Sequence, residues 1–384
     1  MGRLLLTGAT GLLGRYLMKD LMTRGIDLAV LVRPSRKNDP HQRIEAAMRV
    51  WEQELQCELP RPMVLCGDII SPDLGLSGPE IRWAAEHCDG IIHNAASLSF
   101  VSTGPDSEPW RSNVGGVKNV LEFCKQAGIR NFHHVSTAYV AGKRHGRVHE
   151  NELNVGQEFS NPYEESKVVA EELVRDADFL DSLTIFRPAI IVGDSRTGMT
   201  FTYHNFYAML QLGLTLAQSM GVQDFTGKFV SNTFKINVDG HERKNLVPVD
   251  WVSEAMARII ADSSLHGNTY HLSPRVPITV RLIRDIMEEV VGLYGLSFSG
   301  ASGTMGGVEA EQVFLKHMEV YHSYWKDDPE FDATNTLKAL PDLPCPLVDR
   351  DMLVRLSKVA IERSFNWRDP KVERIPAPAV LSPV

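Results

Sequence analysis

Tyr163 and Lys167 form the residue pair with the clearest chemical use in this sequence. They stand four residues apart in YEESK, and the apolar positions that follow, such as Val168 and Leu173, recur at helical spacing. Residues four apart lie on one face of a helix. A phenol with its usual pKa of about 10 exchanges protons poorly at pH 7, and a nearby ammonium group lowers that pKa. Tyr163 could then protonate a carbonyl oxygen as a hydride arrives at its carbon.

A hydroxyl group near the end of an earlier segment can hold the same oxygen. The strand-like run at 131–136 ends in Ser136 and continues into Thr137. In an open parallel sheet, ligands bind at the carboxyl ends of the strands. We expect Thr137 to hold the substrate oxygen, and we keep Ser136 as the second candidate.

Three glycines spaced by three residues lie in TGATGLLG, residues 7–14. A short apolar run precedes them, and apolar side chains recur at helical spacing over 12–22, so the glycines join a strand to a helix. Gly8 permits a tight turn, Gly11 lets the backbone approach a pyrophosphate, and Gly14 lets the helix pack on the strand. The helix N-terminus would then face the phosphates. A simple tight turn is the alternative.

The residue after the second strand distinguishes NAD from NADP. NAD-binding units usually carry an acidic residue there, which binds the ribose 2′-hydroxyl. Here the strand at 28–32 ends in Arg33, whose guanidinium can bind a 2′-phosphate by charge-assisted hydrogen bonds. Arg36, Lys37 and Arg43 would offer the phosphate further partners. The sequence therefore favours NADP, the alternative being a solvated arginine.

Strand-like and helix-like segments alternate from Arg3 to Gly193, which is typical of a parallel sheet covered on both faces. The predicted strands lie near Leu4 and at 28–32, 64–65, 90–93, 131–136 and 183–192. After Asp194 the pattern changes. The chain is then expected to return to the sheet with a strand at 245–250, a helix at 251–262 and a strand at 269–273. Two later helices are predicted at 280–294 and 351–365.

The prediction is an α/β fold with a doubly wound parallel sheet (Rossmann) and a smaller, discontinuous C-terminal substrate domain. Residues 1–193 with about 245–275 would form the NADP-binding domain. Residues 194–244 and 276–384 would form the substrate-binding or lid region. The Gly/Ser-rich piece SFSGASGTMGG in that region is expected to be a flexible surface loop.

Over about residues 3–275, the chain resembles the extended short-chain dehydrogenase/reductase family. The motifs are TGATGLLG, Gly67-Asp68, HNAA, Asn113-Val-Gly-Gly, VST, YEESK and Arg187-Pro188. The resemblance implies a catalytic trio of Thr137, Tyr163 and Lys167, with Lys167 also reaching the nicotinamide ribose. Thr137 matches the family's hydroxyl because it lies four residues before Ala141-Gly142, where Tyr-Gly is common in the family.

The resemblance also places the glycine turn on the pyrophosphate, Asp68 beside the adenine and Ala95 along the cofactor. No metal ligand is expected. The cofactor-binding residues that we expect are Gly8, Thr10, Gly11, Leu12, Leu13, Gly14, Arg33, Arg43, Asp68, Ile69, Ala95, Ala96, Lys167 and Pro188.

Within the family, the chain is similar to the thioester-reductase and fatty acyl-CoA reductase branch. The matching stretches are LVRPS, VSTAYVAG, YEESKVVAEELV, TIFRPAIIVGDSRTG and NLVPVDWVSEAM. This similarity implies NADPH-dependent reduction of an acyl thioester to an aldehyde, with a second hydride giving an alcohol as an option. No adenylation or carrier domain is present, so the acyl group would arrive as a CoA ester or on a separate acyl carrier protein.

Two other functions use the same features. A ketone or alcohol oxidoreductase, or a sugar-nucleotide epimerase, would need the same trio. A cofactor-sensing protein without turnover would need the glycine turn but no proton relay, so Tyr163 and Lys167 weigh against it.

Two further segments each have a plain and a functional interpretation. HNFYAMLQLGLTLAQSM, residues 204–220, is apolar nearly all round and must be buried, either in the small domain or a dimer, or as a wall for an acyl chain. The basic loop at 142–147 is either solvated or binds the phosphates of CoA or phosphopantetheine.

Charge and cysteine content narrow the class of protein. With 384 residues and a formal net charge of -8, the chain lacks the basic balance typical of nucleic-acid binding. The five cysteines never occur in C-x-x-C spacing, which indicates neither a disulfide framework nor a zinc site. No signal-peptide pattern or membrane-length apolar run occurs, so we expect a cytoplasmic protein. The oligomeric state stays open.

Overall fold

The computed structural model describes residues 2–35, 38–219, 229–230, 235–236, 238–298, 300 and 326–372. A parallel sheet of seven strands forms its centre, in the order β13-β7-β5-β4-β1-β2-β3. The strands are β1 (Arg3–Thr7), β2 (Leu28–Val32), β3 (Met63–Cys66), β4 (Cys88–His93), β5 (Asn131–Val135), β7 (Ser182–Pro188) and β13 (Thr269–Leu272). The strand order runs outward from β1 in both directions, which confirms the predicted doubly wound sheet.

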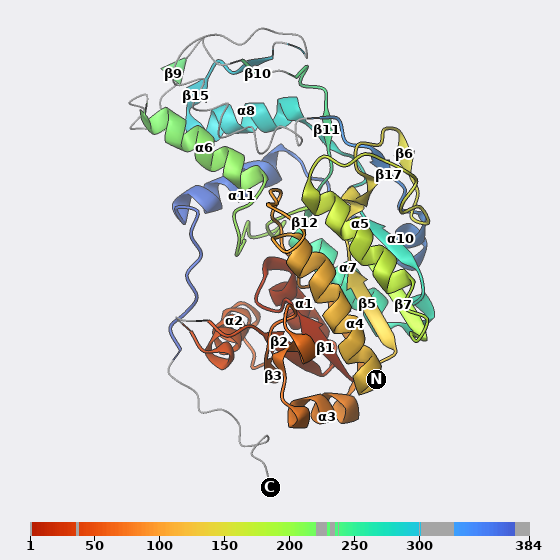
Figure 1. The fold of residues 1–384 in the computed structure, drawn as a ribbon. Coiled ribbons are helices and arrows are strands. Elements are labelled where there is room, and N and C mark those ends of the chain that lie inside the picture. The colour runs from red at the N-terminus through yellow and green to blue at the C-terminus, as the bar shows by residue number, and fades with distance from the viewer. Residues whose placement is uncertain are drawn as a thin grey trace.

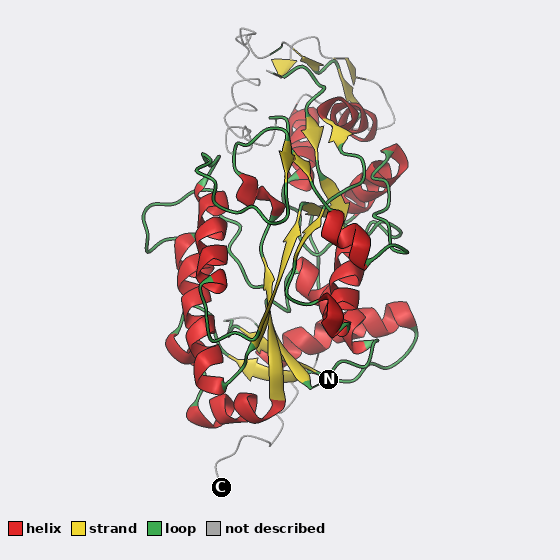
Figure 2. Cartoon of the chain, turned by 90° about the vertical axis from the view of Figure 1, so that its right-hand side faces the viewer, coloured by secondary structure: helices red, strands yellow, loops and turns green. Residues whose placement is uncertain are grey.

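Helices cover both faces of this sheet, as Figure 2 shows with the sheet seen edge-on. On one face, α1 (Leu12–Met22), α2 (Pro40–Leu55) and α7 (Val249–Ala261) pack into a large apolar core. On the other, α3 (Gly78–His87), α4 (Gly116–Ala127) and α5 (Pro162–Arg175) form a second core. The strands are buried on both faces, which explains why β2 reads as the uninterrupted apolar run LAVLV.

A further core lies outside the sheet. It is built from α6 (Phe206–Ser219), α8 (Val280–Val291) and α11 (Arg350–Glu362), which lie together at one end of the molecule (Figure 1). The short strands and helices that complete the described chain are β6 (Arg147–Val148), β8 (Ile190–Val192), β9 (Phe229–Val230), β10 (Lys235–Ile236), β11 (Arg243–Lys244), β12 (Leu246–Pro248), β14 (Ile278–Thr279), β15 (Leu293–Tyr294), β16 (Ser297–Phe298), β17 (Glu330–Phe331), α10 (Thr334–Ala339), η1 (Pro72–Gly75), η2 (Arg111–Gly115), η3 (Ala138–Ala141) and η4 (Ser263–Leu265).

Several elements differ from those expected. The strand expected at 183–192 is divided at Ala189 into β7, in the seven-stranded sheet, and β8, in a separate small sheet. The strand expected at 245–250 is β12, which pairs with β8 in a separate small sheet rather than in the seven-stranded one. The helix expected at 280–294 ends at Val291, because Gly292 adopts a left-handed conformation with φ 72° and caps it. The last helix ends at Glu362, since Ser364 and Phe365 both have positive φ.

Among the described residues, no helix combines the length and apolar character needed to cross a lipid bilayer. The same part of the chain holds no cluster of His, Cys, Asp and Glu side chains suited to a metal ion. Most of the Gly/Ser-rich piece expected to form a surface loop lies outside the described residues.

Candidate active site

The site residues expected from sequence follow six strands that run in one direction. The glycine turn follows β1, Arg33 follows β2, and Asp68 with Ile69 follows β3. Ala95 and Ala96 follow β4, Thr137 follows β5, and Pro188 ends β7. Because these strands are parallel neighbours, their carboxyl ends meet at one edge of the sheet. That edge is the candidate active site.

The glycine turn has the backbone that its sequence predicts. Gly8 has φ +71°, and a Cβ there would lie 2.8 Å from the backbone nitrogen of Ala95. A Cβ on Gly14 would collide with the carbonyl oxygen of Gly8. Gly11 is the N-cap of α1, and no side chain caps this helix, so its first N–H groups and the positive end of its dipole suit an anion. The turn therefore fits a dinucleotide pyrophosphate.

Thr7 ties the glycine turn to the end of β4. Its hydroxyl oxygen accepts hydrogen bonds from the backbone N–H groups of Asn94 (3.1 Å) and Ala95 (3.0 Å), and it lies 3.0 Å from His93 Nδ1. With two N–H donors on that oxygen, the hydroxyl proton is directed to the His93 ring. Burial lowers the pKa of His93 to about 3, so the ring is neutral at pH 7. His93 is thus a buried partner of Thr7.

Helix α5 presents the tyrosine and the lysine together. Asn161 caps its start by accepting the N–H of Glu164 at 3.0 Å, and Pro162 occupies the first turn. Lys167 Nζ donates to the carbonyl oxygen of Val135, the last residue of β5, at 2.8 Å. This bond fixes the helix face that carries Tyr163 against the end of β5.

The pKa of Tyr163 differs from our expectation. Burial raises it to about 12, and the nearby side chain of Thr137 acts in the opposite direction. Burial also lowers the pKa of Lys167 to about 8. Lys167 is not among the groups that shift the phenol pKa here, and burial dominates. At pH 7 Tyr163 is protonated and suited to donate a proton.

The two hydroxyls after β5 face different groups. Thr137 faces the phenol of Tyr163, and its hydroxyl also lies 3.4 Å from the carbonyl oxygen of Pro188. The Ser136 hydroxyl is buried without a hydrogen-bond partner among the described residues. Burial opposes the ionisation of Glu171, Arg187 and Arg175 lower its pKa, and Ser136 has only a minor part in this shift. The structure thus brings Thr137, and not Ser136, to Tyr163.

Behind the trio lies a fully buried ion pair. Glu171 is four residues after Lys167 on α5 and accepts two bonds from Arg187, of 3.0 and 2.6 Å. Both side chains are 0 % exposed. The negative charge of Glu171 favours the charged form of Lys167 against the effect of burial. The sequence analysis did not predict this ion pair, although Arg187 belongs to the Arg187-Pro188 motif.

An aromatic residue of the loop after β4 borders Tyr163. The ring of Phe100 stands edge-on to the Tyr163 ring, with centroids 5.8 Å apart. Its neighbours Leu98 and Val101 are 52 % and 62 % exposed. The loop that borders Tyr163 thus exposes two apolar side chains, which suit contact with an apolar substrate, a feature that the sequence analysis did not single out.

Basic side chains gather after β2, where a 2′-phosphate was expected. Arg33 is exposed, and Arg43 on α2 donates to the Arg33 carbonyl (2.8 Å) and to Thr10 Oγ1 (2.9 Å). Burial, then Arg15 and Arg33, lower the pKa of Arg43. These arginines fit a phosphate. Arg36 and Lys37 lie outside the described residues.

The remaining expected cofactor residues line the same edge. Leu12 and Leu13 begin α1, and the Asp68 carboxylate accepts the N–H of Ile70 at 3.3 Å. Ile69 is buried, and a Cβ on Gly116 would lie 2.8 Å from its side chain.

Contacts in the structure favour the plain interpretation of both the apolar segment that contains α6 and the basic loop at 142–147. In α6, four large side chains are buried in the core shared with α8 and α11, which supports packing within the small domain: Phe206, Tyr207, Met209 and Leu210. In the basic loop, Lys143 lies 3.1 Å from Glu158, Arg144 lies 2.9 Å from Glu152, and Arg147 lies 2.8 Å from Asp332. These carboxylate partners weigh against a free phosphate-binding loop.

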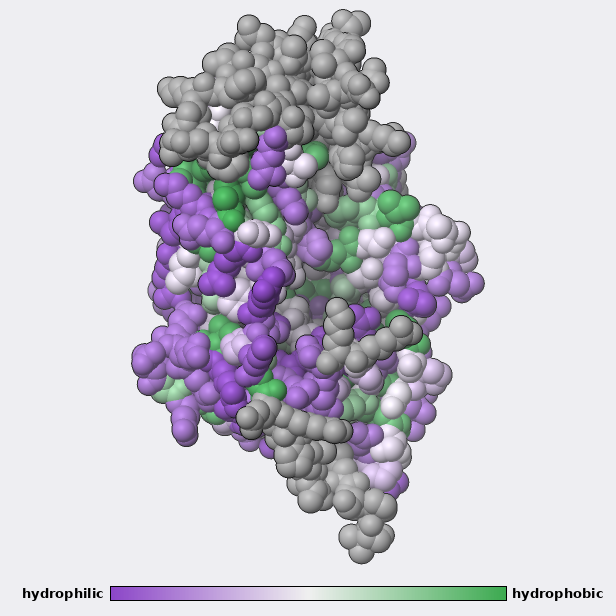
Figure 3. All heavy atoms as spheres, turned by 90° about the vertical axis from the view of Figure 1, so that its left-hand side faces the viewer, coloured by the Kyte–Doolittle hydropathy of each residue, from purple (hydrophilic) through white to green (hydrophobic). Residues whose placement is uncertain are grey.

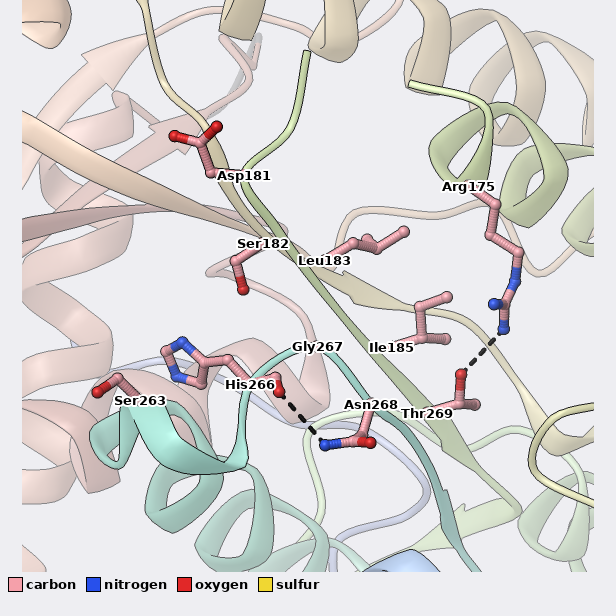
Figure 4. Close-up of a pocket in the computed structure, with 10 residues that line it drawn as sticks. All are labelled: Arg175, Asp181, Ser182, Leu183, Ile185, Ser263, His266, Gly267, Asn268 and Thr269. Carbon is pink, nitrogen blue, oxygen red and sulfur yellow. Dashed lines mark hydrogen bonds between the residues drawn. The ribbon is translucent and has the colours of Figure 1, made fainter. Parts of the chain in front are cut away.

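A pocket of about 480 Å³ lies at the opposite edge of the sheet (Figure 4). Ser182 and Thr269, the first residues of β7 and β13, line it together with Arg175 at the end of α5. Because the trio follows the carboxyl ends of the strands, this pocket is not part of the candidate active site.

Comparisons with known proteins agree with this geometry. The NAD-binding family described as "Male sterility protein" matches residues 6–256. A non-canonical nonribosomal peptide synthetase of Aspergillus hancockii is 27% identical over 92% of this chain and 36% of its own length. The isonitrile lipopeptide synthase of Mycobacterium tuberculosis is 30% identical over 70% of this chain and 11% of its own length. The chain thus spans about a third or less of these relatives.

Among solved structures, the terminal R domain from the myxalamid PKS-NRPS biosynthetic pathway superposes with a TM-score of 0.75. It is 26% identical, and the match covers 97% of this chain and 93% of that domain. The family match covers more than half of the chain and includes the glycine turn, Tyr163 and Lys167. The chain therefore belongs to the male sterility protein family of NAD(P)-binding domains, within the extended short-chain dehydrogenases/reductases.

Proposed function

We propose that this chain is an NADPH-dependent reductase that converts an acyl thioester to an aldehyde. One observation carries the proposal: Thr137, Tyr163 and Lys167 meet at the sheet edge that also holds the glycine turn. The names of the similar proteins, peptide synthetases and a terminal R domain, support a thioester bound to a carrier as the substrate class. In this proposal the acyl group is bound to the thiol of CoA or of a separate acyl carrier protein. The proposal also includes a second reduction, from aldehyde to alcohol, and a cytoplasmic location.

Each residue of the trio has a separate task. NADPH, when bound, supplies the hydride to the thioester carbonyl. Tyr163, protonated at pH 7, donates to the oxygen on which negative charge develops, and Thr137 holds the same oxygen. Lys167 positions the face of α5 through its bond to Val135 and offers a cation near the nicotinamide ribose. The resulting hemithioacetal then loses the thiol and leaves the aldehyde.

The proposed cofactor site is formed by the residues around the glycine turn. Gly8, Gly11 and Gly14 with the N-terminus of α1 hold the pyrophosphate, and Asp68 lies beside the adenine. Arg33 and Arg43 hold the 2′-phosphate. Residues 1–193 with about 245–275 form the cofactor domain in this proposal. Residues 194–244 and 276–384 form the substrate-binding region.

Removing the Arg33 guanidinium should cost NADPH affinity selectively. A hydrogen bond to a charged group contributes about 1.5–3 kcal/mol, so Arg33→Ala should weaken NADPH binding roughly 10- to 100-fold and leave NADH binding nearly unchanged. Calorimetric titration of both cofactors measures the effect. Arg49→Ala, on an exposed position of the same helix as Arg43, is the matched control. Equal losses for NADPH and NADH would remove Arg33 from the 2′-phosphate site.

Thiol release tests the reaction itself. A hemithioacetal collapses with loss of its thiol, whereas a reduced ketone has no such leaving group. NADPH oxidation with an acyl-CoA or an acyl carrier protein should therefore release one thiol per substrate molecule, which a thiol reagent detects. Oxidation of NADPH by ketones, or conversion of nucleotide sugars, without thiol release from any thioester would contradict the proposal.

A further inference from the structure

The C-terminal segment 366–372 returns to the glycine-turn helix. After α11, the chain runs down the side of the molecule that carries α2 (Figure 1). There the Asp369 carboxylate accepts both arms of the Arg15 guanidinium, at 2.6 and 2.8 Å, although the two residues are 354 positions apart. The Gln42 amide on α2 donates to the Val372 carbonyl at 3.4 Å. The segment therefore spans α1 and α2 at their N-terminal ends.

The contact with Arg15 is enclosed by other groups. The Arg15 side chain is only 7% exposed, and its Nε donates to the carbonyl oxygen of Thr10 at 3.1 Å. Its guanidinium lies over the Phe201 ring, 4.7 Å from the centroid. Trp367 packs edge-on against Phe201 and donates its indole N–H to Asp369 at 2.8 Å. A bidentate, partly buried pair of this kind is more than a loose surface contact.

Asp369 binds Arg15 and lies close enough to interact electrostatically with Arg43, one of the two arginines proposed for the 2′-phosphate. The Arg43 guanidinium donates to the hydroxyl oxygen of Thr10, and the Arg15 guanidinium donates to the carbonyl oxygen of Thr10. Burial opposes ionisation of Asp369, but Arg15 and also Arg43 outweigh it and hold its pKa below the ordinary value. The side of the molecule that carries α2 is largely hydrophilic (Figure 3). Asp369 is thus an anion that faces cations a 2′-phosphate would also face.

This inference rests on the proposed NADP site. We propose that Asp369 is a specificity-determining residue of the cofactor site, an internal carboxylate that competes with the 2′-phosphate for the arginine cluster. Asp369 binds Arg15, and its charge also acts on Arg43, so it offsets part of the positive charge of the cluster formed by Arg15, Arg33 and Arg43. Its charge repels the phosphate but has little effect on NADH, which carries a hydroxyl at that position. The carboxylate therefore limits the preference for NADPH over NADH.

Asp369→Asn tests the proposal because it removes the charge and keeps the shape. Exposed and partly exposed charge pairs contribute modestly, so NADPH affinity should rise roughly two- to fivefold while NADH affinity stays the same. Asp369→Glu retains the charge and should restore the wild-type ratio of the two affinities. Glu362→Gln makes the same change of charge at an exposed position at the end of α11 and should leave the ratio unaltered.

The readout is the ratio of NADPH to NADH dissociation constants, measured by titration. If the Asp369–Arg15 pair had a structural role alone, Asp369→Asn would change the melting temperature or both affinities together. An unchanged ratio of the two affinities would overturn the proposal. Weaker NADPH binding by Asp369→Asn would overturn it as well. Because no thioester is used, the result is independent of the proposed reaction. If Arg33→Ala loses NADPH selectively while Asp369→Asn leaves the ratio unaltered, the NADP site stands and this inference fails.

Discussion

Tyr163→Phe should lower kcat by about 10²- to 10⁴-fold, the usual contribution of general acid catalysis, while the NADPH dissociation constant stays the same. The substitution removes one hydroxyl that matters only when negative charge develops on the substrate oxygen. Because burial raises the pKa of Tyr163 to about 12, the wild-type phenol carries its proton throughout the neutral range. Single-turnover reduction of an acyl thioester, followed by NADPH absorbance, measures the chemical step.

Tyr270→Phe is the matched control. Tyr270 lies on β13 and donates its hydroxyl to the Leu265 carbonyl, away from the trio, so this variant should keep its turnover. Retention of more than about a third of the wild-type rate by Tyr163→Phe, with chemistry shown to limit turnover, would remove Tyr163 from the mechanism.

Glu171→Ala should destabilise the protein by about 3–5 kcal/mol, the cost of leaving one member of a buried ion pair without its partner. Arg187 is 0% exposed and would remain charged in the interior, with its longer bonds to the Glu150 carbonyl (3.4 Å) and His271 (3.3 Å). Urea unfolding measures the free energy. Arg175 would also lose its two bonds to Glu171, but its side chain is partly solvated and contributes less.

Glu172→Ala is the control for this substitution, because Glu172 is the next residue of α5 and bonds the exposed side chain of Asn154. It should cost less than about 1 kcal/mol. The double variant Glu171→Ala/Arg187→Met should recover part of the loss, since it removes the unpaired charge. A loss below about 1 kcal/mol for Glu171→Ala alone would contradict a strong role for this pair.

The local sequence pattern was sufficient to predict the central sheet and the helices that cover it. The alternation of apolar strands and amphipathic helices led to the doubly wound sheet, because both periodicities are properties of neighbouring residues. The glycine turn was recognisable for the same reason, since its three glycines each serve a contact within the β1–α1 unit or just beside it. Tyr163 and Lys167 share a helix face by spacing alone.

Helix and strand ends were harder to predict than the elements themselves. Gly292 ends α8 by adopting a left-handed conformation, a signal present in the sequence that the apolar pattern beyond it obscured. The partner of β12 could not be predicted, because an apolar tripeptide pairs equally well with several strands. Likewise, the apolar surface of α6 predicted burial, but only the packing of α8 and α11 decided what covers it.

Tertiary structure alone decided the groups that tune the candidate site. Ser136 and Thr137 are adjacent hydroxyls in the sequence, and only the packing of α5 against β5 brings Thr137 to Tyr163 while it buries the Ser136 hydroxyl without a hydrogen-bond partner among the described residues. The pKa values of Tyr163 and Lys167 depend on burial, which no local pattern specifies. The pair of Arg15 and Asp369 joins residues 354 positions apart. Sequence determines such contacts only through the whole fold, because a charge finds its partner by proximity in space and not by spacing along the chain.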